Sequence, residues 1–171
     1  MRGVPECGAP PPLEHKTLKI EIKKSCKPNS FRMTLAEKQQ ELIAALRVFK
    51  TAQDRLAYLV RRGRQHPPLN PGLKTEAHRL EGCLAKVWFV PEFEQGRCHF
   101  KIDSDSAIVK GIAAVLCEFY SGAAPDEIIA TSPGFLEQFG ITQHLTPNRR
   151  NSLSAISAAI HAFARNSKAV N

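Results

Sequence analysis

The chain has 171 residues, of which 43% are hydrophobic and 23% charged, and its formal net charge is +8. This composition is typical of a folded protein of ordinary domain size and argues against a disordered chain. No apolar run approaches the roughly 20 residues that cross a membrane, so we expect no membrane span. Aromatic residues make up only 7%, and half of the net charge lies in residues 1–32, so the rest of the chain does not look like a nucleic-acid-binding surface.

The first 32 residues differ in composition from the rest of the chain. Residues 1–32 are rich in proline and lysine and offer few apolar side chains to bury, so we predict a disordered basic extension. Met33 is a candidate natural start that would make this extension an upstream addition. An organelle transit peptide is the rival interpretation, although three glutamates in the extension count against it. Residues 33–171 are then predicted to form one domain.

Five cysteines are present, and none of them forms a CxxC pair. An odd number with this spacing fits neither a disulfide framework nor a zinc site. The extension also lacks the apolar segment and cleavage site of a secretory signal peptide. We therefore expect free thiols in a reducing compartment, a cytoplasmic location and no bound metal.

Two helices are predicted at the start of the domain. Thr34 followed by Glu37 forms a capping-box pattern, and apolar residues then recur at helical spacing. This pattern predicts one helix over residues 35–50 and a second over residues 52–62. Gly63 is expected to end the pair in a left-handed conformation.

A proline-rich connection and a β-hairpin follow. Residues 66–72 contain three prolines and cannot continue a helix. Residues 86–93 and 97–103 have strand-forming composition, and the glycine-containing segment 94–96 between them predicts a hairpin turn. Because an isolated hairpin is marginally stable, we expect a further strand at residues 77–80.

The second half of the domain is predicted to be mostly helical. The acidic and serine residues 103–106 are expected to cap a helix whose apolar side chains, within residues 108–119, form the centre of the core. Further helices are predicted to start at Pro125, Pro133 and Pro147. This order of elements predicts an α+β fold with a small antiparallel β-sheet flanked by helices.

Cys83 is the candidate reactive residue. It follows Gly82 at the junction between a loop and a predicted strand, where glycine permits a sharp turn and the approach of another molecule. Nearby Arg79 and Lys86 would favour its thiolate. The alternative is that Cys83 is a small buried hydrophobe, which is the expected role of Cys117. Cys98 and His99 alternate along a predicted strand and point to opposite faces, so we expect no ligand pair there.

Three motifs then occur in order along the chain: GC-x-x-x-VW from Gly82, DSD-x-AIVKG from Asp103, and TQHLTP-x-R from Thr142. Over about residues 34–168 the chain resembles the SufE family, the sulfur-acceptor partners of cysteine desulfurases. The resemblance implies the α+β fold of SufE- and NifU-like proteins, with a small sheet flanked by helices.

The resemblance also implies a function for Cys83. In this family the corresponding cysteine accepts persulfide sulfur from a SufS-like, pyridoxal-phosphate-dependent cysteine desulfurase, stimulates that enzyme, and passes the sulfur to an iron–sulfur scaffold. The protein would act by transpersulfidation as an accessory protein, without a cofactor of its own, because the pyridoxal phosphate belongs to the partner. The family's site-supporting or partner-docking positions correspond here to Gly82, Asp105, His144 and Arg149.

The chain departs from the family pattern near the cysteine. Leu84 and Ala85 stand where the family often has two polar residues, which leaves the local hydrogen bonding and the choice of partner open. Asn148 replaces a serine, and His78 stands where asparagine is common. From the residues alone, the aspartates of the second motif are expected to be helix caps and not a catalytic pair.

Two other functions stay open at this point. The domain could dock a desulfurase or another protein without carrying sulfur. The basic extension could bind nucleic acid, with an affinity that falls steeply as salt rises. We favour the sulfur carrier, because the resemblance assigns a role to Cys83, and expect neither a nucleic-acid nor a membrane partner.

Overall fold

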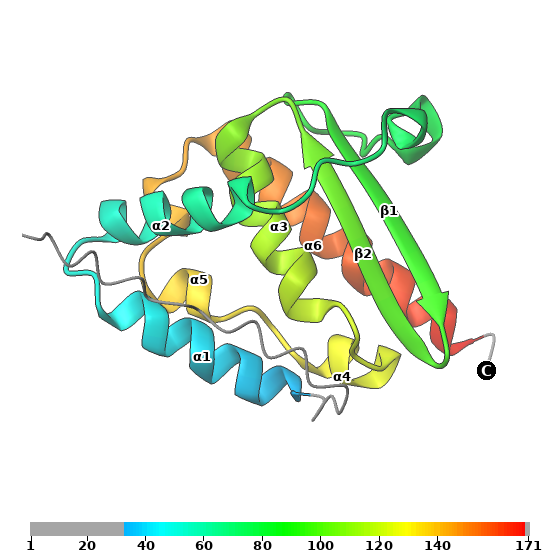
Figure 1. The fold of residues 1–171 in the computed structure, drawn as a ribbon, viewed down its shortest axis with the longest axis horizontal. Coiled ribbons are helices and arrows are strands. Elements are labelled where there is room, and N and C mark those ends of the chain that lie inside the picture. Colours follow the sequence, from blue (N-terminus) through cyan, green and yellow to red (C-terminus); the bar gives the residue numbers. More distant parts are fainter. Residues whose placement is uncertain (1–32, 170–171) are drawn as a thin grey trace, which may run out of the picture. The chain divides into compact units, whose positions relative to one another are not determined.

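A β-hairpin lies along one side of the fold, and helices pack against it (Figure 1). The computed structural model describes residues 33–169, so the predicted extension lies outside the described residues. Strands β1 (Val87–Glu94) and β2 (Arg97–Ser104) pair in antiparallel register, with Glu94 opposite Arg97. The predicted α+β fold with a small antiparallel sheet flanked by helices is confirmed.

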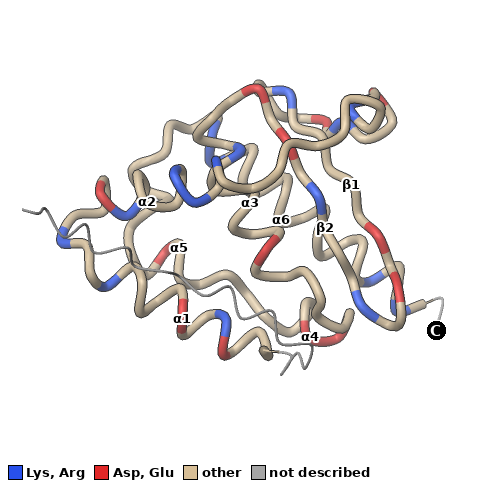
Figure 2. Tube along the Cα trace, viewed as in Figure 1, with Lys and Arg blue, Asp and Glu red and all other residues tan. Residues whose placement is uncertain are grey.

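The first two helices begin where the sequence predicts. The capping box of α1 (Leu35–Arg47) is present: the Thr34 backbone N–H donates to Glu37 at 2.7 Å, and the Glu37 N–H donates to the Thr34 hydroxyl at 3.2 Å. Helix α2 (Ala52–Arg64) follows, and basic residues gather at its C-terminal end (Figure 2).

The prediction that Gly63 ends α2 is wrong. Gly63 lies inside the helix and is buried against Gly111 of α3 (Ala107–Tyr120). A Cβ built on Gly63 would lie 2.2 Å from the Gly111 Cα, and one on Gly111 would lie 2.6 Å from the Val60 Cα. The two glycines therefore let α2 and α3 approach at backbone contact.

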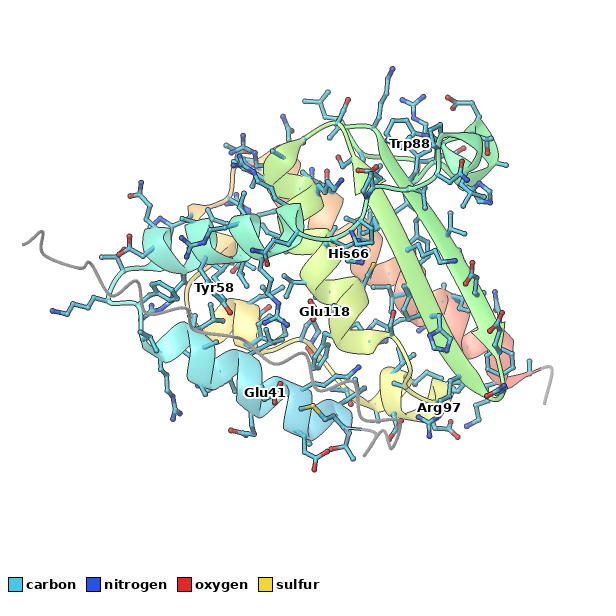
Figure 3. The ribbon with its side chains drawn as sticks, in the orientation of Figure 1. Glu41, Tyr58, His66, Trp88, Arg97 and Glu118 are labelled. Carbon is cyan, nitrogen blue, oxygen red and sulfur yellow. The ribbon has the colours of Figure 1, made fainter. Side chains whose placement is uncertain are left out.

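The connection between α2 and the hairpin contains two short 3₁₀ helices, η1 (Pro71–Leu73) and η2 (Glu76–His78). The predicted strand at residues 77–80 is therefore wrong. In place of a third strand, this segment makes one isolated bridge, between Arg79 and Trp88. It also makes one hydrogen bond, from the Leu80 N–H to the Val87 carbonyl at 2.8 Å. Trp88 lies beside this connection (Figure 3).

The hairpin turn consists of two residues. Gln95 and Gly96 both have positive φ, 51° and 74°, as a type I′ turn requires, and this turn matches the twist of the flanking strands. Glycine takes this conformation without steric cost. The prediction of a hairpin with glycine in its turn is confirmed.

Helix α3 forms the buried centre of the fold, and α2, β2 and α6 (Pro147–Lys168) pack around it. Its N-cap is Ser106, whose hydroxyl accepts from the Val109 N–H. The remaining short helices are α4 (Pro125–Ala130), α5 (Phe135–Gln138) and η3 (Thr142–His144). Within residues 33–169, no helix combines the length and apolar character needed to cross a membrane.

Candidate functional site

Cys83 lies in the loop of residues 81–86, which we call the cysteine loop, between η2 and β1. Its side chain is partly buried and packs against the core, whereas the next residue, Leu84, is 81% exposed. Gly82 has a φ of 76°, and no atom of the described residues lies within 4 Å of the position that a Cβ would take. The cysteine is therefore half sheltered, on a turn that glycine favours.

The ends of the cysteine loop are held by hydrogen bonds. At one end Leu80 bonds to Val87. At the other end the Lys86 N–H donates to the Asp105 carboxylate at 3.0 Å, and the Asp105 N–H donates to the Lys86 carbonyl at 3.2 Å. Asp105 thus contacts the loop three residues after Cys83, and its carboxylate anchors the loop where the sequence-based expectation was a helix cap.

A pocket of about 370 Å³ lies beside the cysteine loop. Leu84 and Ala85 form its wall on the loop side, and the other lining residues come from the starts of α3 and α6: Ser106, Val109, Thr146, Asn148, Arg149 and Ser152. Two helix N-termini therefore face this pocket, together with Arg149. The positive ends of helix dipoles and a guanidinium favour an anion in such a place.

The structure brings three of the four supporting residues to this region. Gly82 belongs to the loop, Asp105 anchors it, and Arg149 lines the pocket beside it. His144 is exposed in η3, which packs against α2 and α5, and it is not among the residues that line the pocket. Arg79, expected to favour the thiolate, instead pairs with Glu76 at 3.1 Å.

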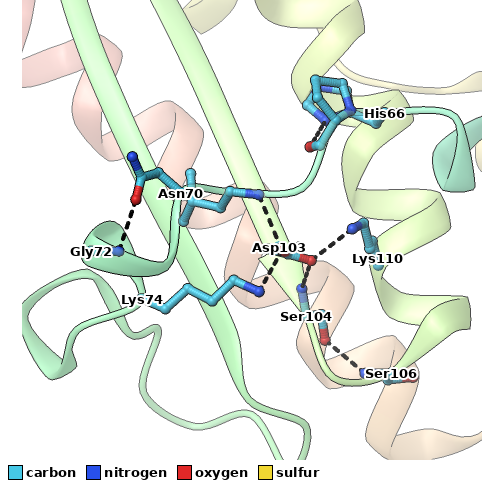
Figure 4. Close-up of polar contacts among 10 residues, drawn as sticks. His66, Asn70, Gly72, Lys74, Asp103, Ser104, Ser106 and Lys110 are labelled. Carbon is cyan, nitrogen blue, oxygen red and sulfur yellow. Dashed lines mark hydrogen bonds and ion pairs between the residues drawn. The ribbon is translucent and has the colours of Figure 1, made fainter.

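Asp103 has a role that the sequence did not reveal. The residue is only 3% exposed, and its carboxylate forms ion pairs with Lys74 at 2.8 Å and with Lys110 at 2.9 Å (Figure 4). It also accepts backbone N–H groups of Leu69 at 3.2 Å and of Ser104 at 2.9 Å. The expectation that Asp103 caps a helix is therefore wrong.

This cluster of charges determines the ionisation of Asp103. Burial opposes its negative charge, but the hydrogen-bonded ammonium groups of Lys74 and Lys110 and the two backbone N–H groups outweigh that effect and lower its pKa to about 2. The Lys74 ammonium also lies 5.5 Å from the centre of the Trp88 ring. Asp103 thereby ties the segment of residues 66–74, which we call the strap, to the end of the hairpin.

The two other cysteines within the described residues are core side chains, which confirms the prediction made for Cys117. Cys98 and Cys117 are fully buried, and burial raises the pKa of both thiols. Among the three described cysteines, Cys83 alone has any solvent access. No group of three or more metal-ligating side chains was found in the part of the chain that the structure describes.

Comparisons with known proteins identify relatives. Residues 40–164 match the family model "SufE: Fe-S metabolism associated domain". The chain is 32% identical over 120 residues to SufE-like protein 1, chloroplastic/mitochondrial, of Arabidopsis thaliana. This match covers 70% of the chain and 32% of that protein. It is 34% identical over 89 residues to an uncharacterized SufE-like protein of Synechocystis, in a match that covers 52% of the chain and 56% of that protein. The chain thus spans a third to about half the length of these relatives.

A solved structure shares the fold. The solution structure of a hypothetical protein from Thermus thermophilus matches with a TM-score of 0.62 at 21% identity. The match covers 77% of this chain and 96% of that protein. At this identity the likeness bears on the fold alone.

Proposed function

The chain belongs to the SufE family, and we propose that it is a sulfur carrier for iron–sulfur cluster assembly. Cys83 receives sulfur as a persulfide from a pyridoxal-phosphate-dependent cysteine desulfurase, whose activity the protein stimulates. The protein then passes the sulfur to a downstream scaffold. The observation that carries the proposal is the position of Cys83, the one partly exposed cysteine among those described, on a loop anchored at its ends.

The reaction requires a nucleophilic sulfur and no external oxidant. The Cys83 thiolate attacks the terminal sulfur of the partner's cysteine persulfide, so that one sulfur–sulfur bond forms as another breaks. The partner's cysteine leaves as a thiolate, and the proton of the Cys83 thiol passes to solvent. A second exchange of the same kind delivers the terminal sulfur to the next thiol.

The geometry of the loop suits a sulfur that must be alternately sheltered and presented. Backbone hydrogen bonds hold Leu80 and Lys86, while Gly82 lies between them with open space around it. A persulfide is an anion at neutral pH and is easily oxidised. The neighbouring pocket, with two helix N-termini and Arg149, offers an anion-favouring shelter next to the loop.

The proposal is tested by incubating the full-length protein with a cysteine desulfurase and cysteine, followed by intact mass measurement and peptide mapping. We expect sulfur added to Cys83, removable by reductant and absent from Cys98 and Cys117. Cys83→Ser is expected to bind the desulfurase but to accept no sulfur and to lose the stimulation of the enzyme.

The competing function is a docking module that binds a desulfurase or another protein without carrying sulfur. Leu84, an apolar side chain that is 81% exposed where the family often has a polar residue, is the observation in its favour. An unmodified Cys83 beside a bound and active desulfurase, with stimulation retained in Cys83→Ser, would establish this function in place of the carrier.

A further inference from the structure

A second and larger hollow, of about 510 Å³, lies away from the cysteine loop. The C-terminal half of α2, the middle of α3 and the first residues after α2 form its walls (Figure 3). Among residues 33–169, it shares no lining residue with the pocket beside the cysteine loop. We call it the basic cleft, and its polar lining residues are Tyr58, Arg61, Arg62, Gln65, His66 and Glu118.

The charge that lines the basic cleft is positive in balance, because Arg61 and Arg62 line it together with Glu118. Arg64 follows on the same helix, and the chain contains no aspartate or glutamate from residue 55 to residue 75. Within residues 33–169, Glu118 is the one carboxylate that lines the cleft, and Arg62 already binds it, donating through two nitrogens at 2.7 and 3.2 Å. Arg61 and Arg64 make no ion pair with any side chain in residues 33–169.

The helix dipole explains only part of this arrangement. Cations at the C-terminal end of a helix are favourable in themselves. The dipole effect explains the arginines at the end of α2. It does not explain why they line a hollow, or why a glutamine, a histidine and a tyrosine line the same hollow. A volume of about 510 Å³ lies within the range of roughly 300–1,000 Å³ that is typical of binding pockets.

We propose that the basic cleft binds an acidic segment of the protein that delivers sulfur to Cys83. The guanidinium of Arg61 lines the cleft and matches the planar geometry of carboxylates, which arginine can bind through two hydrogen bonds. Arg64, three positions later on α2, does not line the cleft but is exposed and adds a second cation to the same helix end. Gln65 and Tyr58 supply neutral polar groups, and the Tyr58 ring adds an apolar wall. The identity of the partner as a cysteine desulfurase rests on the proposed function.

The cleft is better suited to a protein than to a nucleic acid. Proteins that bind single strands use a groove with several aromatic rings on which successive bases stack. Among residues 33–169, the lining of the basic cleft has one phenol ring, that of Tyr58, and so offers no row of rings for successive bases.

The position of the cleft connects it to the cysteine loop along the chain. His66 and Pro67, which line the cleft, begin the strap. The strap continues through Leu69, held by Asp103, toward the cysteine loop. A partner seated in the cleft would therefore contact the same stretch of chain that leads to Cys83.

The test compares two double variants of the full-length protein with the same change in charge. Arg61→Glu with Arg64→Glu, the cleft variant, reverses one cation that lines the cleft and one that follows it on α2. Arg165→Glu with Lys168→Glu, the α6 variant, reverses two exposed cations at the end of α6. The dissociation constant for a cysteine desulfurase is measured at low and at physiological ionic strength. We expect the cleft variant to bind about tenfold more weakly at low ionic strength and to show a smaller dependence on salt. The α6 variant is expected to bind within about twofold of the wild type.

Two further measurements separate this proposal from the sulfur-carrier proposal. A hexaglutamate peptide should compete with the desulfurase for the wild-type protein, and the rate of Cys83 alkylation by iodoacetamide should be equal in both variants and the wild type.

Equal binding of the desulfurase by the two variants would overturn the cleft proposal even if Cys83 still accepted sulfur. Weaker binding by the cleft variant together with a Cys83 that never accepts sulfur would uphold the cleft and overturn the carrier. Loss of affinity for a single-stranded oligonucleotide, without loss of affinity for the desulfurase, would assign the cleft to nucleic acid instead.

Discussion

Asp103 and Asp105 stand two positions apart and hold different parts of the chain. The buried carboxylate of Asp103 binds Lys74 and Lys110 and fastens the strap. The exposed Asp105 binds the backbone of Lys86 and fastens the cysteine loop. The end of β2 explains the difference: Asp103 lies within the strand, whereas Asp105 follows its last residue, Ser104, in the connection that leads to α3. Replacing each aspartate is therefore expected to have a different effect.

Replacing Asp103 by asparagine should lower stability in a pH-dependent way. The pKa of Asp103 is depressed from 3.8 to about 2 in the folded protein, so its ionisation stabilises the fold by about 2 kcal/mol above pH 4. That contribution is lost as the pH falls from about 4 to about 2, because the carboxylate becomes protonated in the folded state also. Urea unfolding at several pH values should show a gap between wild type and Asp103→Asn that narrows over this interval. A gap independent of pH would contradict the ion-pair assignment.

Replacing Asp105 by alanine should loosen the cysteine loop with little effect on the fold. The change removes one hydrogen bond to the Lys86 N–H, worth roughly 1 kcal/mol. We expect faster alkylation of Cys83 by iodoacetamide and a free energy of unfolding within about 1 kcal/mol of the wild type. Asp126→Ala, another exposed aspartate, is the control and should leave the alkylation rate unchanged. An unaltered rate in Asp105→Ala would show that this bond does not restrain the loop.

At the scale of elements, contacts between helices depend on single residues. Gly63 and Gly111 allow α2 and α3 to meet at their backbones. Lys38 of α1 donates to three carbonyl oxygens at the end of α3, those of Glu118, Phe119 and Ser121, at 3.3, 3.1 and 2.7 Å. Carbonyls at a helix C-terminus have no partner within the helix, so the ammonium group stabilises the end of α3 while joining it to α1.

Gly111→Ala should destabilise the protein by roughly 1–3 kcal/mol, because the added methyl group would lie 2.6 Å from the Val60 Cα and would force α2 away from α3. Alanine favours a helix over glycine by about 1 kcal/mol, so the measured loss is what remains after that gain. Gly134→Ala is the control for the added methyl group alone, since no atom of residues 33–169 lies within 4 Å of its Cβ position; Gly134 is the N-cap of α5, so the helix-interior gain does not apply to it. Thermal and urea unfolding should separate the two variants, and equal stabilities would refute the close contact.

For the whole molecule, the fold gathers the cysteine loop, the Asp105 segment and the start of α6 at one place, and it forms the basic cleft between α2 and α3 at another. A partner that binds both the cysteine loop and the basic cleft would contact the strap, which connects the two along the chain. The arrangement separates the sulfur chemistry, which needs Cys83, from the electrostatic attraction of a partner, which the arginines supply at a distance.

Removal of residues 1–32 should leave sulfur transfer intact, because the match to the family model begins at residue 40. The shortened protein is expected to accept sulfur on Cys83 at a rate within about twofold of the full chain, since most exposed charges contribute little individually. Peptide mapping after timed incubation with the desulfurase measures this rate. If the shortened chain accepted no sulfur, the extension would be part of the transfer site. Oligonucleotide binding lost with the extension would support its role in nucleic-acid binding.

The cellular compartment is also a property of the whole protein. The cytoplasmic location remains a prediction, and the Arabidopsis relative has a name that places that protein in chloroplasts or mitochondria.

Features that depend on residues close together in the chain could be predicted from the sequence alone. The capping box of Thr34 and Glu37 spans three positions, and the hairpin turn depends on Gly96 and its neighbour, so local geometry specifies them. The order of three motifs likewise identified the family, and Cys83 as its candidate reactive residue.

Contacts between distant residues emerged only when the chain was folded. Asp103 and Lys74 are 29 positions apart, and nothing in their local sequence marks them as an ion pair. The same holds for the contact of Gly63 with Gly111 and for Arg149 beside the cysteine loop. The predicted third strand failed for a related reason: strand pairing depends on the partner available, and η2 together with a single bridge to Trp88 occupies that edge. Such contacts follow from how helices and strands pack, which composition and periodicity do not specify.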